Sequence, residues 1–132
     1  MADCCCSDKN IVFFTCSGAA NVGQVANQAA VDLQQEHVGH MLCLAGIGCH
    51  NETMIAHGTS ADRVVGIDGC PTGCTKKTLD HSGVPMTDYV VVTELGFKKK
   101  PHDGSIDTEA VARVKDAVRR RLAADADSVG PF

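Results

Sequence analysis

The stretch IVFFTCSGAANVGQVANQAAVDL, residues 11–33, contains an apolar run, a loop of small residues and an amphipathic stripe in direct succession. The apolar run at 11–15 is continuous, which is typical of a strand that is buried on both faces of a sheet. Beyond the loop at 16–21, apolar side chains recur every three or four residues, at Val22, Val25, Ala26, Ala29 and Leu33. This spacing predicts a helix that lies on the sheet and ends near His37.

The same alternation of strand and helix continues along the chain. Further apolar, β-rich runs predict strands at residues 41–45, 63–67 and 89–93. Helices are predicted at about 52–57, from the DGCPTGC segment through about residue 81, and along the stripe of Val111, Val114, Val118 and Leu122. In the middle one of these helices, Pro71 fits the first position, where the missing amide proton costs nothing.

This pattern predicts an α/β fold with helices on both faces of a mostly parallel sheet and right-handed crossovers. We expect a single three-layer domain with four strands, flavodoxin/Rossmann-like, and we favour the strand order 2-1-3-4. The domain is predicted to span residues 11–124, between a flexible cysteine-rich N-terminus at 1–10 and a C-terminal tail at 125–132.

The bulk composition argues against several classes of protein. With 132 residues, of which 44% are hydrophobic, the chain can bury one core without disulfides or other staples. Its net charge of −4 argues against nucleic acid or an anionic membrane as the partner. The N-terminus lacks the apolar stretch of a signal peptide, and no run approaches membrane-spanning length. We therefore expect a cytoplasmic protein.

Cysteine is the residue type that carries the chemistry. The chain has eight cysteines, and without an export signal we expect reduced thiols rather than a disulfide framework. Ligands of open α/β sheets bind outside the carboxyl ends of the strands. Four cysteines from three segments are predicted to converge at that edge: Cys16, Cys43, Cys70 and Cys74.

Cys70 and Cys74 form the most specific pair in this set. Residues four apart share one face of a helix, so both sulfur atoms are expected to face the same point. The helix N-terminus would stabilise the thiolate, the form of cysteine that binds metal or attacks disulfides. Small buried cysteines at strand ends are the plainer alternative.

Four thiolates favour a soft metal ion, and we predict a zinc site with metal–sulfur distances of about 2.3 Å. An iron–sulfur cluster uses the same ligands and remains the alternative metal centre. The partner is then a metal ion, with a redox or metal-donor protein as a further partner.

Other residues are weaker candidates for this site. Cys49 could replace Cys43 as a ligand if the second strand ends later than predicted. A histidine in the position of His50, beside Cys49, is more often a surface residue than a ligand. Asp68 could cap or orient the turn that carries Cys70 without binding the metal itself. The run Cys4, Cys5 and Cys6 could trap a soft metal or simply be exposed. The basic runs at 98–100 and 119–121 are predicted to be solvated faces.

A thiol enzyme or sulfur carrier is the main alternative to a metal site. It would use Cys16 or Cys70 as a nucleophile with a lowered pKa and Cys74 as the resolving thiol. Its three-residue spacer differs from the two-residue spacer of thioredoxin-like sites. A cysteine phosphatase is rejected, because its loop needs an arginine six residues after Cys16 and Val22 stands there.

Four of these segments together resemble the DGC-domain family, whose members are thought to bind zinc through cysteines. They are TCSGAANVGQVANQAA from Thr15, MLCLAGIG from Met41, IDGCPTGCTKK from Ile67 and DYVVVTELG from Asp88. The resemblance implies a small domain with no established catalytic activity. Its cysteine pattern corresponds to Cys16, Cys43, Cys70 and Cys74, whereas Cys49 stands where similar sequences are expected to have glycine.

Overall fold

A parallel sheet of four strands forms the centre of the protein. The structure is a computed structural model, and it describes residues 9–127. The strands lie in the order β2-β1-β3-β4, and every pair is parallel. Their bounds are β1 Ile11–Thr15, β2 His40–Met41, β3 Arg63–Asp68 and β4 Asp88–Val91. The predicted α/β class and strand order are confirmed.

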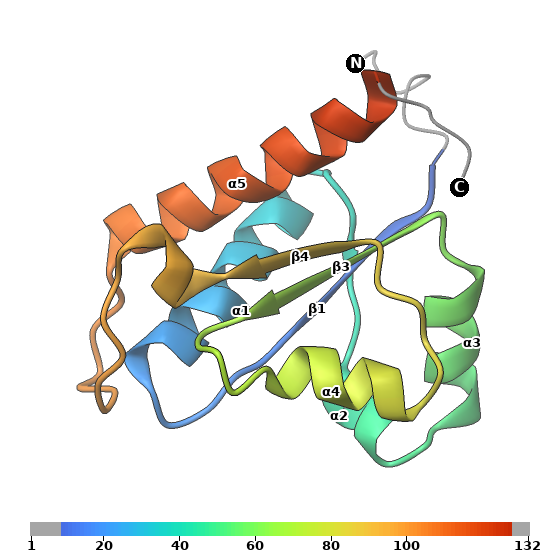
Figure 1. The fold of residues 1–132 in the computed structure, drawn as a ribbon, viewed down its shortest axis with the longest axis horizontal. Coiled ribbons are helices and arrows are strands. Elements are labelled where there is room, and N and C mark those ends of the chain that lie inside the picture. The colour runs from blue at the N-terminus through green and yellow to red at the C-terminus, as the bar shows by residue number, and fades with distance from the viewer. Residues whose placement is uncertain (1–8, 128–132) are drawn as a thin grey trace.

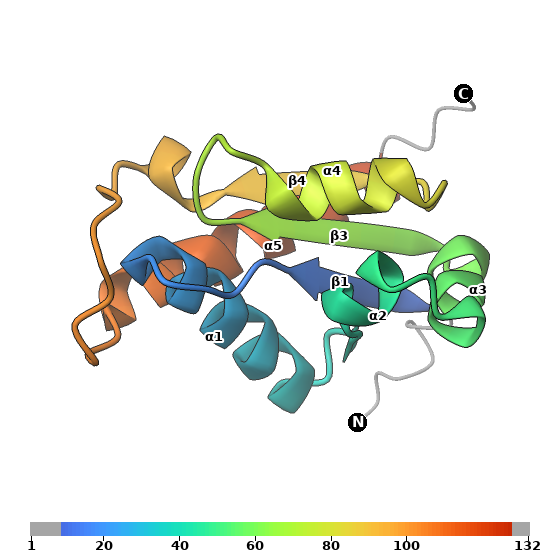
Figure 2. The same ribbon diagram turned by 90° about the horizontal axis from the view of Figure 1, so that it is seen from below.

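Helices cover both faces of this sheet (Figures 1 and 2). On one face lie α1 (Asn21–Gln35) and α5 (Thr108–Asp127), whose valines and alanines pack against Phe13 and Val65. On the other face, α2 (Leu44–Gly48), α3 (Glu52–Ser60) and α4 (Cys74–His81) contribute to a second cluster around Phe14. Because side chains alternate along a strand, neighbouring residues of β1 supply the two cores.

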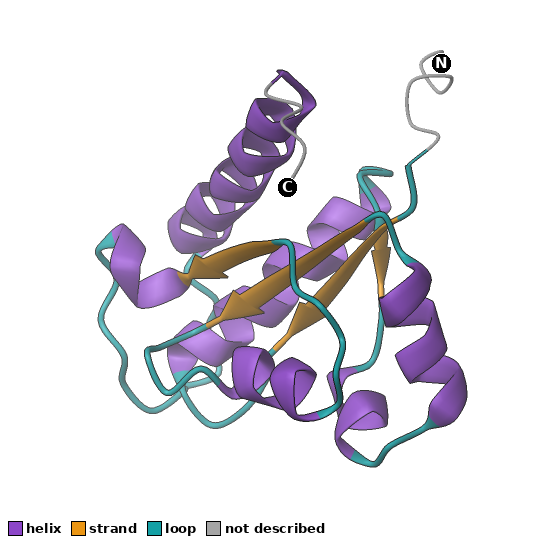
Figure 3. Ribbon diagram, turned by 45° about the vertical axis from the view of Figure 1, so that its right-hand side comes forward, coloured by secondary structure: helices purple, strands orange, loops and turns teal. Residues whose placement is uncertain are grey.

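The register brings the carboxyl ends of the inner strands to one edge, as the parallel arrows in Figure 3 show. Thr15 of β1 pairs with Ile67 of β3, and Asp68 pairs with Val91 of β4. The Cys16 amide donates to the Ile67 carbonyl at 3.1 Å, so the first residue after β1 is held against β3. This edge therefore presents the segments that follow three different strands.

The predicted strand at 41–45 is wrong beyond its first residue. The edge strand β2 pairs only with β1 and contains just His40 and Met41, and the chain then turns into α2. Ile47 of this short helix is fully buried, and Gly46 leaves little room beside Met54 of α3. An apolar run of this length is compatible with a strand or a buried helix, and packing against α3 decides for the helix.

The expected helix start at Pro71 is also wrong. Residues 69–73 form a turn, closed by a 3.2 Å bond from the Gly73 amide to the Cys70 carbonyl, and α4 begins only at Cys74. Gly73 has a φ of 69°, a left-handed conformation that interrupts a helix and favours glycine. Cys70 and Cys74 therefore do not share the face of one helix.

One further difference concerns the C-terminal half. Strand β4 stops at Val91, and residues predicted as its end begin the 3-10 helix η2 (Val92–Leu95) instead. The predicted final helix is confirmed as α5, which buries Val111, Val114 and Val118. No helix within residues 9–127 combines the length and apolar character that a membrane span requires.

Candidate functional site

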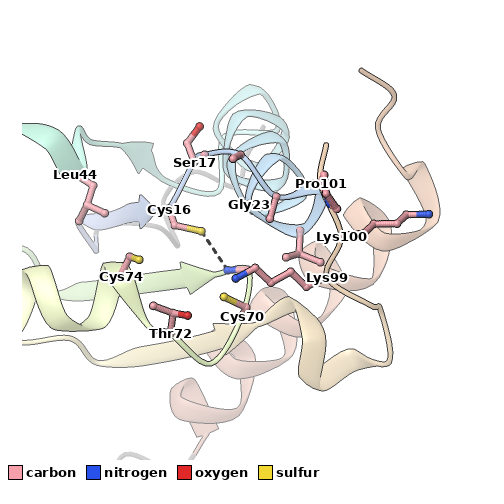
Figure 4. A pocket seen from close by; sticks show the side chains of 15 residues that line it. Cys16, Ser17, Gly23, Leu44, Cys70, Thr72, Cys74, Lys99, Lys100 and Pro101 are labelled. Carbon is pink, nitrogen blue, oxygen red and sulfur yellow. Dashed lines mark hydrogen bonds between the residues drawn. The ribbon is translucent and has the colours of Figure 1, made fainter. Parts of the chain in front are cut away.

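A pocket of about 630 Å³ opens at the carboxyl edge of the sheet (Figure 4). Three segments form its walls: the loop from Cys16 to Gly23, the turn at residues 69–74, and the segment at 99–101. Leu44 of α2 closes one side. The pocket therefore lies where the strand order places the ends of β1 and β3 beside each other.

Cys16 is the most enclosed of the three thiols in this pocket. Its sulfur accepts a hydrogen bond from the Gly69 amide at 3.1 Å, which ties the end of β1 to the turn after β3. Burial raises the pKa of Cys16 to about 11, and the charges of Asp68, Cys74 and Cys70 act in the same direction. The Gly69 hydrogen bond opposes this shift but does not cancel it. Near neutral pH the free Cys16 side chain is therefore a thiol.

Cys70 lies in a different electrostatic setting. Hydrogen bonds to its sulfur from the side chain and the backbone of Thr72 lower the pKa of Cys70, and the ammonium of Lys99 adds to the effect. Its side chain is half-buried in the turn. Of the thiols in the pocket, this one is held in surroundings that favour a thiolate.

Cys74 is the first residue of α4 and is exposed at the mouth of the pocket. Figure 4 shows its sulfur and those of Cys16 and Cys70 pointing into the same space. All three residues line the pocket, and the charges of Cys70 and Cys74 help to raise the pKa of Cys16. The predicted convergence of these three cysteines is thus reproduced, although by a turn and a helix start rather than by one helical face.

Asp68 lies directly beneath the cysteine turn and is 1% exposed. Its carboxylate accepts hydrogen bonds from the amides of Thr75 at 2.8 Å and Lys76 at 3.2 Å, which caps α4. The hydroxyl of Tyr89 donates to the same carboxylate at 2.7 Å. Asp68 therefore fixes the start of α4, and with it the position of Cys74.

Sequence reasoning missed Tyr89, because only the pairing of β3 with β4 brings its hydroxyl to Asp68. Burial and the neighbouring carboxylate of Asp68 raise the pKa of Tyr89, so its hydroxyl is a hydrogen-bond donor at neutral pH. The only local signal was a polar aromatic residue at the start of an apolar strand, which is too common to identify a function.

Sequence reasoning also missed Lys99. The basic run at 98–100 is exposed, as predicted, but Lys99 and Lys100 also line the pocket. Figure 4 shows the Lys99 side chain reaching back towards Cys70, whereas that of Lys100 points away from it. A run of lysines carries no sequence signal that separates these two orientations.

The remaining predicted site residues lie outside the pocket lining. Cys43 is exposed and lies directly before α2. Its neighbour Leu44 lines the pocket, but Cys43 does not. Cys49 is exposed at the end of α2, where its sulfur donates to the Gly46 carbonyl at 3.5 Å. The ring of His50 lies 5.6 Å from that of His81. The predicted candidates Cys4, Cys5 and Cys6 lie outside the described residues.

The thiols face one another across the pocket without forming a ready coordination shell. Among the residues that the structure describes, no three side chains of histidine, cysteine, aspartate or glutamate are already arranged to hold a metal ion. The donor atoms match a soft metal ion in type, but metal binding would require the three sulfur atoms to move closer together.

Fold and site together define a small α/β domain with a thiol-lined pocket at the carboxyl edge of its sheet. The DGC domain family matches residues 12–118 of this chain, and the chain belongs to that family. One relative is the protein named anaerobic and virulence modulator AnvM of Pseudomonas aeruginosa strain PAO1. It is 33% identical over 87 residues, and the aligned part covers 66% of each chain, just under two thirds of the relative's length. No solved structure matches.

Proposed function

We propose that this protein binds a soft metal ion, with zinc as the first choice, through the thiolates of Cys16, Cys70 and Cys74. The observation that carries the proposal is the convergence of three sulfur atoms on one pocket from two chain segments, the end of β1 and the turn that leads into α4. Cysteines without a shared role are not expected to line one cavity together. Soft thiolates are the ligands that zinc, copper(I) and iron–sulfur centres prefer.

Three protein ligands leave one position of a tetrahedral ion open. Structural zinc sites are usually closed by four protein ligands, whereas sites with three protein ligands accept water or another molecule. This arrangement favours a metal-handling or reactive site over a purely structural clamp. Cys43 lies one residue before Leu44, which lines the pocket. If a fourth protein ligand completes the tetrahedral site, we propose that it is Cys43.

The surroundings of the pocket favour the thiolate at Cys70 and oppose it at the buried sulfur of Cys16. The Gly69 amide donates to Cys16, and Lys99 together with Thr72 favours the thiolate of Cys70. Because the free Cys16 side chain is protonated near neutral pH, binding of the metal displaces its proton. Thiols also need reducing conditions, which is consistent with the expected cytoplasmic location.

Metal analysis of protein purified without oxygen tests the proposal. We expect about one zinc ion per chain and no absorbance in the visible range. A brown protein with visible absorbance and bound iron would instead identify an iron–sulfur cluster. A colourless protein that carries no metal, and takes up none when zinc is added under reducing conditions, would contradict the proposal.

Thiol chemistry is the second candidate function, and the surroundings of Cys70 favour it. Thr72 and Lys99 lower the pKa of Cys70, while Cys16 and Cys74 stand near enough to act as resolving thiols. The name of the relative from Pseudomonas aeruginosa describes a modulator linked to anaerobic conditions. A thiol site that responds to oxidation would be suited to such a role.

The two pKa directions predict an order of reactivity in the metal-free protein. At pH 7 to 8, Cys70 should react with iodoacetamide at least about tenfold faster than Cys16, since only the thiolate is nucleophilic. Raising the pH towards 11 should narrow the difference, because Cys16 then ionises. Mass spectrometry of peptides after timed alkylation measures both rates, and equal rates at pH 7 would contradict these assigned environments.

A further inference from the structure

We infer that the pocket beside the thiols binds a small organic anion with an apolar body, and that Lys99 binds its charged group. The inference goes beyond the proposed metal site, and the two do not depend on each other. It rests on the size and lining of the pocket, on the way the segment carrying Lys99 is fixed, and on the direction of that side chain.

The pocket has the dimensions and the surface of a small-molecule site. Its volume of about 630 Å³ falls within the range of about 300 to 1,000 Å³ that is usual for such sites. Apart from the thiols, most of its wall consists of small or apolar residues, including Ala19, Ala20, Val22, Leu44 and Pro101. Such walls favour an apolar ligand body that fills the cavity by contact rather than by hydrogen bonding.

The segment that carries Lys99 is fixed to the opposite wall of the pocket on both sides of the lysine. The Asn21 side chain donates to the Lys98 carbonyl at 3.0 Å and accepts from the Lys100 amide at 2.7 Å. The Asn21 amide also donates to the Lys100 carbonyl at 2.8 Å. Just beyond, Ala20 and Pro101 form an isolated antiparallel bridge. The backbone of Lys99 is therefore positioned before any ligand arrives, which reduces the entropy lost on binding.

The Lys99 side chain turns inward from this fixed backbone. Figure 4 shows it extending along the pocket so that its ammonium lies close to Cys70. Within the described part of the chain, no carboxylate forms an ion pair with Lys99, although the chain has a net charge of −4. An ammonium over an apolar cavity, without a carboxylate partner, attracts an anionic group of a ligand.

The inferred ligand therefore joins two features, a carboxylate- or sulfonate-like group near Lys99 and an apolar body against the walls. Its charged end would lie next to Cys70, so that the ligand and the thiols share one space. This placement distinguishes the inference from simple attraction of anions to a basic surface run.

A matched pair of fluorescent probes tests the inference on the reduced full chain. 1-Anilinonaphthalene-8-sulfonate carries an anionic group, and N-phenyl-1-naphthylamine is a similar apolar body without charge. We expect the wild-type protein to bind the sulfonate at one site, and Lys99→Met to weaken that binding about fivefold without changing the neutral probe. Lys77→Met is the matched control, because Lys77 is an exposed lysine of α4 outside the pocket lining.

A second variant locates the probe in the pocket. Gly18 is an exposed residue of the pocket lining, and a Cβ atom placed on it meets no atom within 4 Å, so Gly18→Phe is expected to fold and to obstruct the pocket at its rim. Both probes should then bind at least about tenfold more weakly, with an unchanged circular dichroism spectrum as the check on folding. Loss of affinity for the sulfonate alone would argue against a shared apolar site.

Several results would overturn the inference. They are absence of sulfonate binding to the wild-type protein, unchanged binding in Lys99→Met, or an equal loss in Lys77→Met. The zinc content of the wild-type protein, measured beside its probe binding, keeps the two proposals apart. Lys99-dependent probe binding by a protein that takes up no zinc would reject only the metal site, and zinc uptake without such probe binding would reject only the anion site.

Discussion

Cys70→Ser is expected to reduce the zinc content of the purified protein from about one ion per chain to background. Serine keeps the size and the hydrogen-bonding capacity of the side chain but replaces the soft sulfur donor with a hard, neutral hydroxyl. Thr72 and Lys99 lower the pKa of Cys70 and so favour its thiolate. Loss of this ligand leaves Cys16, whose pKa of about 11 opposes ionisation, and the exposed Cys74.

Two further cysteine variants make this result specific. Cys49→Ser changes an exposed thiol outside the pocket lining and is expected to retain the full zinc content. Cys43→Ser should weaken zinc binding less than Cys70→Ser does, because Cys43 lies beside the pocket rather than in its lining. Full zinc content in Cys70→Ser, or equal loss in Cys49→Ser, would refute the proposed ligands.

Asp68→Ala is the second change for which we expect a large effect. The substitution removes the acceptor of the Thr75 and Lys76 amides and of the Tyr89 hydroxyl, and it leaves these donors near or within the core without a partner. Loss of a helix cap together with unsatisfied buried donors should lower the free energy of unfolding by about 3 kcal/mol. Because α4 starts at Cys74, the affinity for zinc should fall as well.

Urea denaturation measures this stability change, and two variants serve as references. Tyr89→Phe removes only one of the three hydrogen bonds and should cost about 1 kcal/mol. Asp103→Ala removes a carboxylate that accepts hydrogen bonds from Ser105 in an exposed turn, and should lower the free energy of unfolding much less than either of the other two changes. A value for Asp68→Ala as small as that of Asp103→Ala would contradict its assigned role beneath the cysteine turn.

The fold could be predicted from sequence where local pattern and tertiary packing agree. The run at 11–15 and the stripe of α1 have unambiguous periods, and they became the central strand and the helix that covers it. At residues 41–45 the pattern was ambiguous, because five apolar residues suit a strand or a short buried helix. There the pairing of β2 ended after Met41, and packing of Ile47 favoured the helix.

The site could be predicted in part, because strand order brings certain chain positions to one edge whatever the details of the turns. This reasoning placed Cys16, Cys70 and Cys74 around one space, whereas Cys43 lies just outside the pocket lining, because β2 ends at Met41 and the chain turns into α2. The contacts that shift the pKa of Cys70 and hold Asp68 in place could not be predicted from the sequence. Lys99 and Tyr89 lie far along the chain from Cys70 and Asp68, and only the folded backbone brings each pair together.

X-ray absorption spectroscopy at the zinc edge of the zinc-loaded protein tests the central claim most directly, because it identifies the atoms bound to the metal. The proposed site predicts at least three sulfur ligands at about 2.3 Å, and loss of one sulfur in Cys16→Ser or Cys74→Ser wherever the variant still binds zinc. A first shell made mainly of nitrogen and oxygen, or a sulfur shell that is the same in both variants, would contradict it.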